Sequence, residues 1–212
     1  MILLSKKTFS VLQELHNNGF RNWYSSVCEI ALHYDLNIHS LLFNEATKKQ
    51  IKFHIKSHFI RAWMCDLQNV TKYPSLRTYR VIKKEFRCEP YLSIVKKDKF
   101  RSALSRFRAS SHILEIERGR YTKPKTPPEK RFCIKCRDHI EDEYHFMMVC
   151  EIYTNERQLL FSKINDSNLE FSSLDNYSKF TFLFNNDDPK ILSWVGRFIY
   201  NCMILRVIFH EN

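Results

Sequence analysis

The sequence predicts a mainly α-helical protein, with a helical arm, a small Cys3His module and a C-terminal helical tail. Three glycines and six prolines in 212 residues leave few signals for β-hairpins, whereas apolar residues recur over long stretches with the helical period. Three cysteines and a histidine gather between Cys133 and Cys150 with the spacing of a metal site. A hydrophobic content of 44% suffices for a packed core and excludes a disordered chain.

Three helices are predicted in the first 70 residues. The first begins after Ser5, which can cap it, and ends at Asn17-Asn18-Gly19, a typical stop signal. The second covers about residues 22–35, with its apolar side chains on one stripe. The third runs from about residue 38 to residue 70, with aromatic and aliphatic side chains predicted inward and lysines outward.

Shorter elements follow up to the clearest linker in the chain. Residues 76–86 are expected to form a helix or a short strand, residues 91–95 a short segment, and residues 97–108 a helix with Phe100, Leu104 and Phe107 inside. Residues 122–130 contain three prolines and predict a linker. Residues 1–121 are therefore interpreted as a basic helical region that precedes this linker.

The remainder is divided into the module at 131–164 and C-terminal helices at 165–212. One helix is expected from residue 141 through Cys150 to about residue 164. A short helix at about 177–184 precedes a final helix, which Asp187 or Asp188 caps and which has Pro189 in its first turn.

The cysteine and histidine cluster has the pattern Cys133-x2-Cys136-x8-His145-x4-Cys150. This spacing predicts one Zn²⁺ ion with four protein ligands, which leave no position for water and make the ion structural. His139 is an alternative to His145. Positions five apart differ by about 140° around an ideal helix, so His145 and Cys150 can share an ion only if the helix is distorted. Accidental core residues or a redox dithiol are the competing interpretations.

Positive charge is concentrated in the middle of the chain. Net charge is −1 for residues 1–47, +16 for residues 48–131 and −4 for residues 132–212, which together give +11. Such a segment is typical of phosphate contacts with RNA or DNA, although a solvated helical face is the alternative. The predicted nucleic-acid-binding residues are Arg80, Lys83, Lys84, Arg87, Lys96, Lys97, Lys99, Arg101, Arg106, Arg108, Arg118, Arg120, Lys123 and Lys125.

Cysteine usage predicts a reducing, intracellular location, nuclear or cytoplasmic. Seven cysteines are an odd number, and the N-terminal stretch lacks the features of a signal peptide. The apolar stretch at 191–209 is interrupted by Arg197, Asn201 and Arg206, so no membrane span is expected.

Several blocks resemble the region downstream of the polymerase in non-LTR retrotransposon reverse transcriptases. They are Leu76-Arg-Thr-Tyr79, the run 100–112, the run 115–121, Cys133-x2-Cys136, Ile140-Glu-Asp-Glu-Tyr-His145-Phe and Cys150. This resemblance covers about residues 76–157. It implies that Cys133, Cys136, His145 and Cys150 bind zinc and that the preceding basic helices contact template RNA or target DNA. The polymerase itself is missing, because no Tyr/Phe-x-Asp-Asp signature occurs.

These features predict a non-catalytic, nucleic-acid-binding zinc protein derived from such an element. Asp187-Asp188-Pro189-Lys190 is too compressed for a nuclease metal site and fits a helix cap better. One alternative is an interaction scaffold with a purely structural zinc, in which the final helix docks a partner such as another part of the retroelement polyprotein. Another is a remnant without function. The residues predicted to dock the partner are Ile191, Leu192, Val195, Phe198, Ile199 and Cys202.

Overall fold

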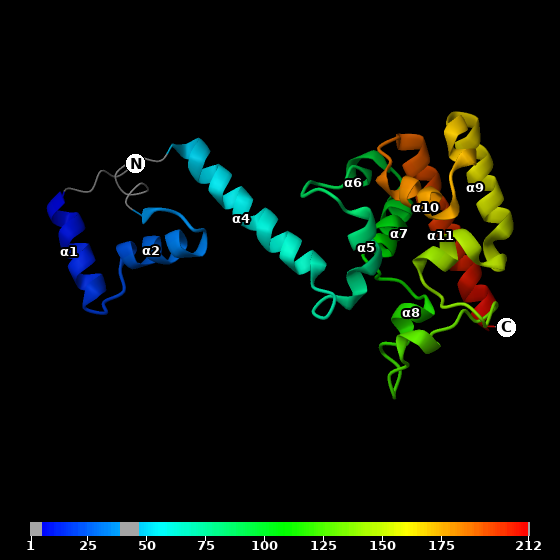
Figure 1. The fold of residues 1–212 in the computed structure, drawn as a ribbon, viewed down its shortest axis with the longest axis horizontal. Coiled ribbons are helices and arrows are strands. Elements are labelled where there is room, and N and C mark those ends of the chain that lie inside the picture. The colour runs from blue at the N-terminus through cyan, green and yellow to red at the C-terminus, as the bar shows by residue number, and fades with distance from the viewer. Residues whose placement is uncertain (1–5, 39–46, 212) are drawn as a thin grey trace. The chain divides into compact units, whose positions relative to one another are not determined.

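Figure 1 shows the computed structural model, which describes residues 6–38 and 47–211. The chain forms two compact units, Met1–Asp66 and Leu67–Asn212. Helices account for almost all regular structure in the described ranges, where β-structure is limited to one isolated bridge between Phe132 and Ile140. The predicted mainly α-helical fold is therefore confirmed.

The first unit contains α1 (Lys6–Asn17) and α2 (Trp23–His33), which pack against each other. Gly19 permits the turn between them because its φ of +84° lies in the left-handed region. Asn22 caps α2 through a capping box with Ser25, and its amide also donates to the carbonyl of Leu12 in α1. Both predicted helices are present, whereas the predicted cap at Ser5 lies outside the described residues.

The third predicted helix is interrupted at Thr47, which lies outside a helix. Helix α4 covers Lys48–Gln68, and residues 39–46 lie outside the described part of the chain. Thr47 starts α4 through a capping box, in which the backbone amide of Gln50 bonds to the Thr47 hydroxyl and the Gln50 side chain accepts from the Thr47 amide. Among the residues of α4 only Leu67 is fully buried; of the predicted inward face, Ile51, Ile55 and Trp63 are half-buried and Phe59 is exposed.

The second unit begins with short elements. A 3-10 turn at Pro74–Leu76 leads into α5 (Arg77–Ile82), which resolves the helix-or-strand alternative in favour of a helix. Two further helices follow, α6 (Tyr91–Ile94) and α7 (Asp98–Arg108). As predicted, Phe100, Leu104 and Phe107 of α7 point into the core.

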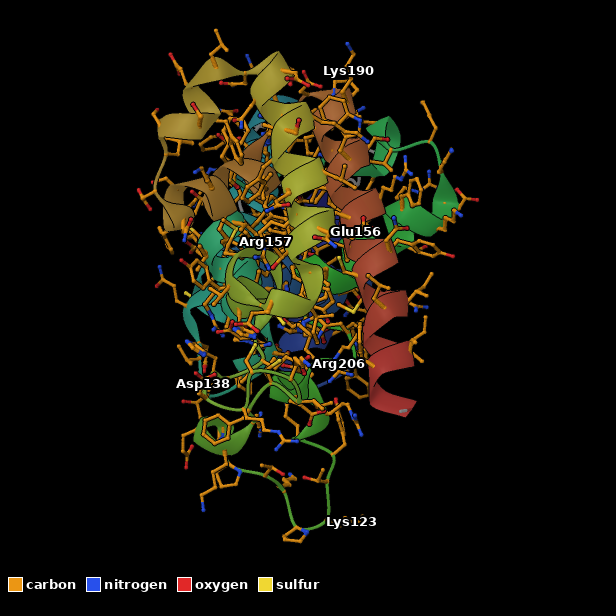
Figure 2. The ribbon with its side chains drawn as sticks, turned by 90° about the vertical axis from the view of Figure 1, so that its right-hand side faces the viewer. Lys123, Asp138, Glu156, Arg157, Lys190 and Arg206 are labelled. Atoms are coloured by element: carbon orange, nitrogen blue, oxygen red, sulfur yellow. The ribbon has the colours of Figure 1, made fainter. Side chains whose placement is uncertain are left out.

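The stretch from residue 115 to residue 131 folds back on itself. After α8 (Glu115–Arg118), the hydroxyl of Thr122 donates to the carbonyl of Gly119 and accepts from the amide of Thr126. Arg131 then donates to the carbonyls of Thr126 and Ile116. The proline-rich segment 122–130 thus lies within the second unit as a hydrogen-bonded loop, with Lys123 at its outer tip (Figure 2).

The C-terminal helices are α9 (Thr154–Ser167), α10 (Asn176–Asn185) and α11 (Pro189–Glu211). Asp175 caps α10, and the carboxylate of Asp188 caps α11 by accepting from the amides of Lys190 and Ile191. Of the two predicted caps, Asp188 has this role, whereas Asp187 forms an ion pair with Arg87 at 3.5 Å.

Helix α11 is the central helix of the second unit and packs along α7. Its length and composition would also suit a membrane span, a property that it shares with the core helices of soluble proteins. The apolar face predicted to dock a partner is instead the core-facing surface of α11. Its six residues, all at most 3% exposed, are Ile191, Leu192, Val195, Phe198, Ile199 and Cys202.

Candidate metal centre

The first two ligands lie on a tight turn. The amide of Cys133 donates to the carbonyl of His139 at 2.7 Å, which closes the loop at its base next to the Phe132–Ile140 bridge. The amide of Arg137 donates to the carbonyl of Cys133 at 2.8 Å, and Arg137 has a φ of +59°. This turn directs the side chains of Cys133 and Cys136 toward the same point.

The second pair of ligands brackets a π-helical turn. The turn covers His145–Val149, and the amide of Cys150 donates to the carbonyl of His145 at 2.8 Å, five residues earlier. Cys150 itself has a ψ of 128°, so the helix ends there, and α9 starts only at Thr154. The single helix predicted from residue 141 to residue 164 is therefore wrong. The wide turn and this break bring His145 and Cys150 to the same side, which an ideal α-helix would prevent.

The four predicted ligands meet in space. One ligand atom from each of Cys133, Cys136, His145 and Cys150 lies within 4.8 Å of the others. The Cys150 sulfur is 3.8 Å from the Cys133 sulfur and 3.9 Å from the Cys136 sulfur. Thiolates around a tetrahedral ion with metal–sulfur bonds of about 2.3 Å would be separated by about 3.8 Å. The group can therefore hold a metal ion.

The structure distinguishes the two candidate histidines. His145 is 3% exposed, and both of its ring nitrogens are buried without a hydrogen-bond partner. His139 is exposed, bonds through Nδ1 to the Asp138 carboxylate at 2.6 Å, and stacks on the His145 ring at 5.5 Å. Buried polar atoms normally have a hydrogen-bond partner, and a neutral imidazole nitrogen is a common metal ligand. The unpaired, buried ring of His145 is therefore the better candidate for the fourth ligand.

Electrostatics within the cluster favour a cation. A hydrogen bond with Cys150 is the main cause that lowers the pKa of Cys133 to about 3. The same hydrogen bond, together with burial, raises the pKa of Cys150, and burial raises that of Cys136. Three sulfurs this close cannot all ionise unless a positive charge lies between them. A bound metal ion would supply that charge.

A half-buried arginine supports the second ligand pair from the start of α9. Arg157 donates through Nε to the carbonyl of Met147 at 2.9 Å and through Nη2 to the carbonyl of Cys150. Both carbonyls lie where the regular helical hydrogen bonds are interrupted, because the helical turn ends at Cys150. Arg157 therefore holds the irregular backbone that positions the ligand.

Two buried glutamates connect the ligand loop to the rest of the unit. Glu143 is 1% exposed, receives hydrogen bonds from Arg77 and Ser110, and lies 2.7 Å from Nε2 of His112. Burial alone would raise the pKa of Glu143, but His112, Arg77 and Ser110 together lower it to about 2. The charged carboxylate is thus fixed just before His145.

Glu141 forms the second connection. Arg206 of α11 donates to both of its carboxylate oxygens, at 2.8 and 2.6 Å, and also reaches Glu115 at 3.0 Å. The amide of Glu115 donates to the same carboxylate at 2.7 Å. Sequence reasoning missed both glutamates as structural residues. Their only signal was the acidic run 141–143, next to the ligands and after a strongly basic segment.

Three of the fourteen predicted nucleic-acid contacts have structural roles. Arg80 donates to the carbonyls of Leu67 and Tyr73. Lys83 and Arg108, which are buried, both pair with Glu89 at 2.6 Å, and Arg108 also donates to the carbonyl of Phe184. All three side chains stabilise the fold, and the buried Lys83 and Arg108 are not available to phosphates in this structure.

The other eleven are at least partly exposed. Four of them form ion pairs: Arg87 with Glu85 and Asp187, Arg101 with Asp98, Arg118 with Glu115, and Arg120 with Glu117. Seven exposed cations have no carboxylate within ion-pair distance in the described ranges. They are Lys84, Lys96, Lys97, Lys99, Arg106, Lys123 and Lys125.

Comparisons with known proteins give no match: no family model, no curated protein and no solved structure is similar to this chain. The site is therefore interpreted from its own geometry, and the retrotransposon resemblance stays an expectation from the sequence blocks.

Proposed function

We propose that this chain is a non-catalytic nucleic-acid-binding protein whose fold is stabilised by one structural zinc ion, and that it derives from the C-terminal region of a retrotransposon reverse transcriptase. The proposal is based mainly on seven exposed lysine and arginine side chains that have no carboxylate within ion-pair distance in the described ranges. They precede the Cys3His group in the sequence. Such cations are suited to phosphate contacts with little sequence preference.

Zinc is the proposed metal because of the donor set. Three thiolates and one imidazole in tetrahedral arrangement are typical of structural zinc sites. All four positions would be filled by protein atoms, which leaves none for a reacting water. Binding would contribute on the order of 10 kcal/mol to folding, as in small zinc modules. Three thiols must stay reduced for this role, which supports an intracellular location, nuclear or cytoplasmic.

Helix α7 is the proposed centre of the nucleic-acid-binding surface. Lys97 and Lys99 lie over the ring of Phe100 at 5.6 and 5.4 Å, and Lys99 also lies 4.8 Å from the ring of Tyr200. These contacts hold the lysine side chains along the surface while their ammonium groups stay accessible. We propose that they bind the phosphate backbone of RNA or DNA.

Two measurements on the full chain test the proposal. Elemental analysis is expected to find one zinc per chain. Fluorescence anisotropy with single- and double-stranded RNA and DNA is expected to show an affinity that falls steeply between about 50 and 200 mM salt.

A pair of charge reversals shows which surface binds. Lys97→Glu combined with Lys99→Glu should weaken binding and make the salt slope shallower by about 0.7 per lost contact to a single strand. The matched control is Lys163→Glu, at an exposed position of α9. Protein without zinc, salt-independent binding, or an equal effect of the control would contradict the proposal.

A further inference from the structure

A second exposed surface lies between α7 and α11, on the side of α11 that does not face the core. It is a groove of about 540 Å³, lined mainly by apolar side chains. Ile113, Ile204 and Val207 contribute to it and are 40%, 45% and 41% exposed. Monomeric proteins rarely leave several large aliphatic side chains exposed side by side, and such patches mark interaction sites.

The shape of the groove fits one helix. Its walls come from residues 99–106 of α7 and 200–208 of α11, so the two helices line it over about 12 Å. Tyr200, Met203, Ile204 and Val207 follow each other along α11 at successive spacings of three, one and three residues, and they present a continuous apolar wall. A partner helix of about three turns could insert its apolar side chains between the two walls.

The charge around the groove indicates what the partner carries. Lys99 and Arg106 of α7 line one wall, and none of the described residues that line the groove is acidic. Arg106 is exposed and has no carboxylate within ion-pair distance in the described ranges. A helix with an apolar stripe and glutamates on the flank facing α7 would complement both properties.

We propose that the α7–α11 groove binds an amphipathic, acidic helix of a partner protein. A nucleic acid would leave the aliphatic walls without apolar contacts. A lipid surface is flat, whereas these side chains line a hollow. The proposal requires neither zinc nor nucleic acid, although an acidic partner would compete with phosphates for Lys99 and Arg106.

The test uses the full chain and a synthetic, fluorescently labelled helical peptide of about four turns. The peptide carries leucines at i, i+3, i+4 and i+7 with glutamates on one flank. Anisotropy should show binding to the chain, and at least about tenfold weaker binding of a scrambled peptide of the same composition. Val207→Asp should abolish binding while zinc content and helical circular dichroism stay unchanged. The matched control is Leu159→Asp, at an exposed helical position outside the groove.

A charge swap tests the acidic flank. Arg106→Glu should weaken binding of the glutamate peptide, and a peptide with lysines in place of the glutamates should bind this variant better than it binds the natural chain. Equal binding of the designed and scrambled peptides, or equal effects of Val207→Asp and Leu159→Asp, would overturn the proposal. So would a dimer that Val207→Asp dissociates, because a second copy would then occupy the groove. Binding to phosphatidylcholine–phosphatidylserine vesicles without peptide binding would assign the groove to a lipid surface instead.

Discussion

Both ring nitrogens of His145 are buried without a partner, although an unsatisfied buried polar group costs about 1–3 kcal/mol. The neighbouring His139 is exposed and paired with Asp138. His139 and His145 therefore have opposite environments, and only the ring of His145 lacks a partner for its nitrogens. His139 can therefore serve as the control position when His145 is tested as a metal ligand.

We expect His145→Ala to lose the bound metal and His139→Ala to keep it. Removal of the His145 imidazole leaves three ligands, whereas His139 contributes no ligand atom to the cluster. Metal content per chain, measured by inductively coupled plasma mass spectrometry after dialysis, distinguishes the variants. Full metal in His145→Ala combined with loss in His139→Ala would reverse the assignment.

Arg206→Met tests the buried ion pair with Glu141. Both side chains are 3% exposed, so removal of the cation leaves a buried carboxylate without its charged partner. We expect the free energy of unfolding to fall by about 3–5 kcal/mol. Urea denaturation measures this loss, and the exposed Arg197→Met on the same helix is the control. A loss no larger than that of the control would show that the pair contributes little.

The candidate metal ligands could be predicted at the residue scale because cysteine and histidine carry their chemistry in any context. The cations could not be separated in the same way. Lys83 and Arg108 look like their exposed neighbours in the sequence, but both share Glu89, and Arg108 also reaches Phe184, 76 residues away. Such long-range partners depend on tertiary packing. The density of charged residues along the sequence therefore does not show which cations become buried in ion pairs.

At the scale of elements, α7 and α11 approach closely because Gly196 has no side chain. A Cβ at this position would lie 2.9 Å from the carbonyl oxygen of Phe100. That atom belongs to the backbone of α7 and cannot rotate away. The sequence shows a glycine within a long helical pattern but not which helix it faces.

Gly196→Ala is expected to destabilise the second unit by about 1–3 kcal/mol through this overlap. Helix propensity alone predicts the opposite sign, because alanine is favoured over glycine within a helix by about 1 kcal/mol. The midpoint of urea unfolding therefore decides between packing and propensity. An increased midpoint would mean that α7 moves away without cost.

The boundaries of elements show where periodicity is insufficient. Asp188 and Pro189 correctly marked the start of α11, since caps are local signals. The capping box of Thr47 and Gln50, which marks the start of α4, is also a local signal. It was missed because the apolar periodicity of the sequence continues through these residues. The break at Cys150 had no such signal. Its carbonyl is held by Arg157, and its side chain turns toward Cys133, contacts that only the folded chain makes.

At the scale of the whole molecule, all four ligands belong to the second unit. Cys133 and Cys150 are also part of its hydrophobic core, together with Phe146 and Met147. A metal ion would therefore link the ligand loop directly to the core that α7 and α11 form. None of the described residues of the first unit belongs to this group.

Metal removal should consequently loosen one unit selectively. After chelation with 1,10-phenanthroline, we expect the amides of Cys133 and Cys150 to exchange hydrogen at least about tenfold faster, equivalent to about 1.4 kcal/mol of local stability. These amides bond to His139 and His145 in the loops that the ion would close. Amides of α1 and α2 should exchange at unchanged rates, because their hydrogen bonds lie in the other unit. Mass-spectrometric hydrogen exchange measures both regions in one sample. His145→Ala should reproduce the pattern without chelator, and an acceleration that is uniform along the chain would show that the ion stabilises both units.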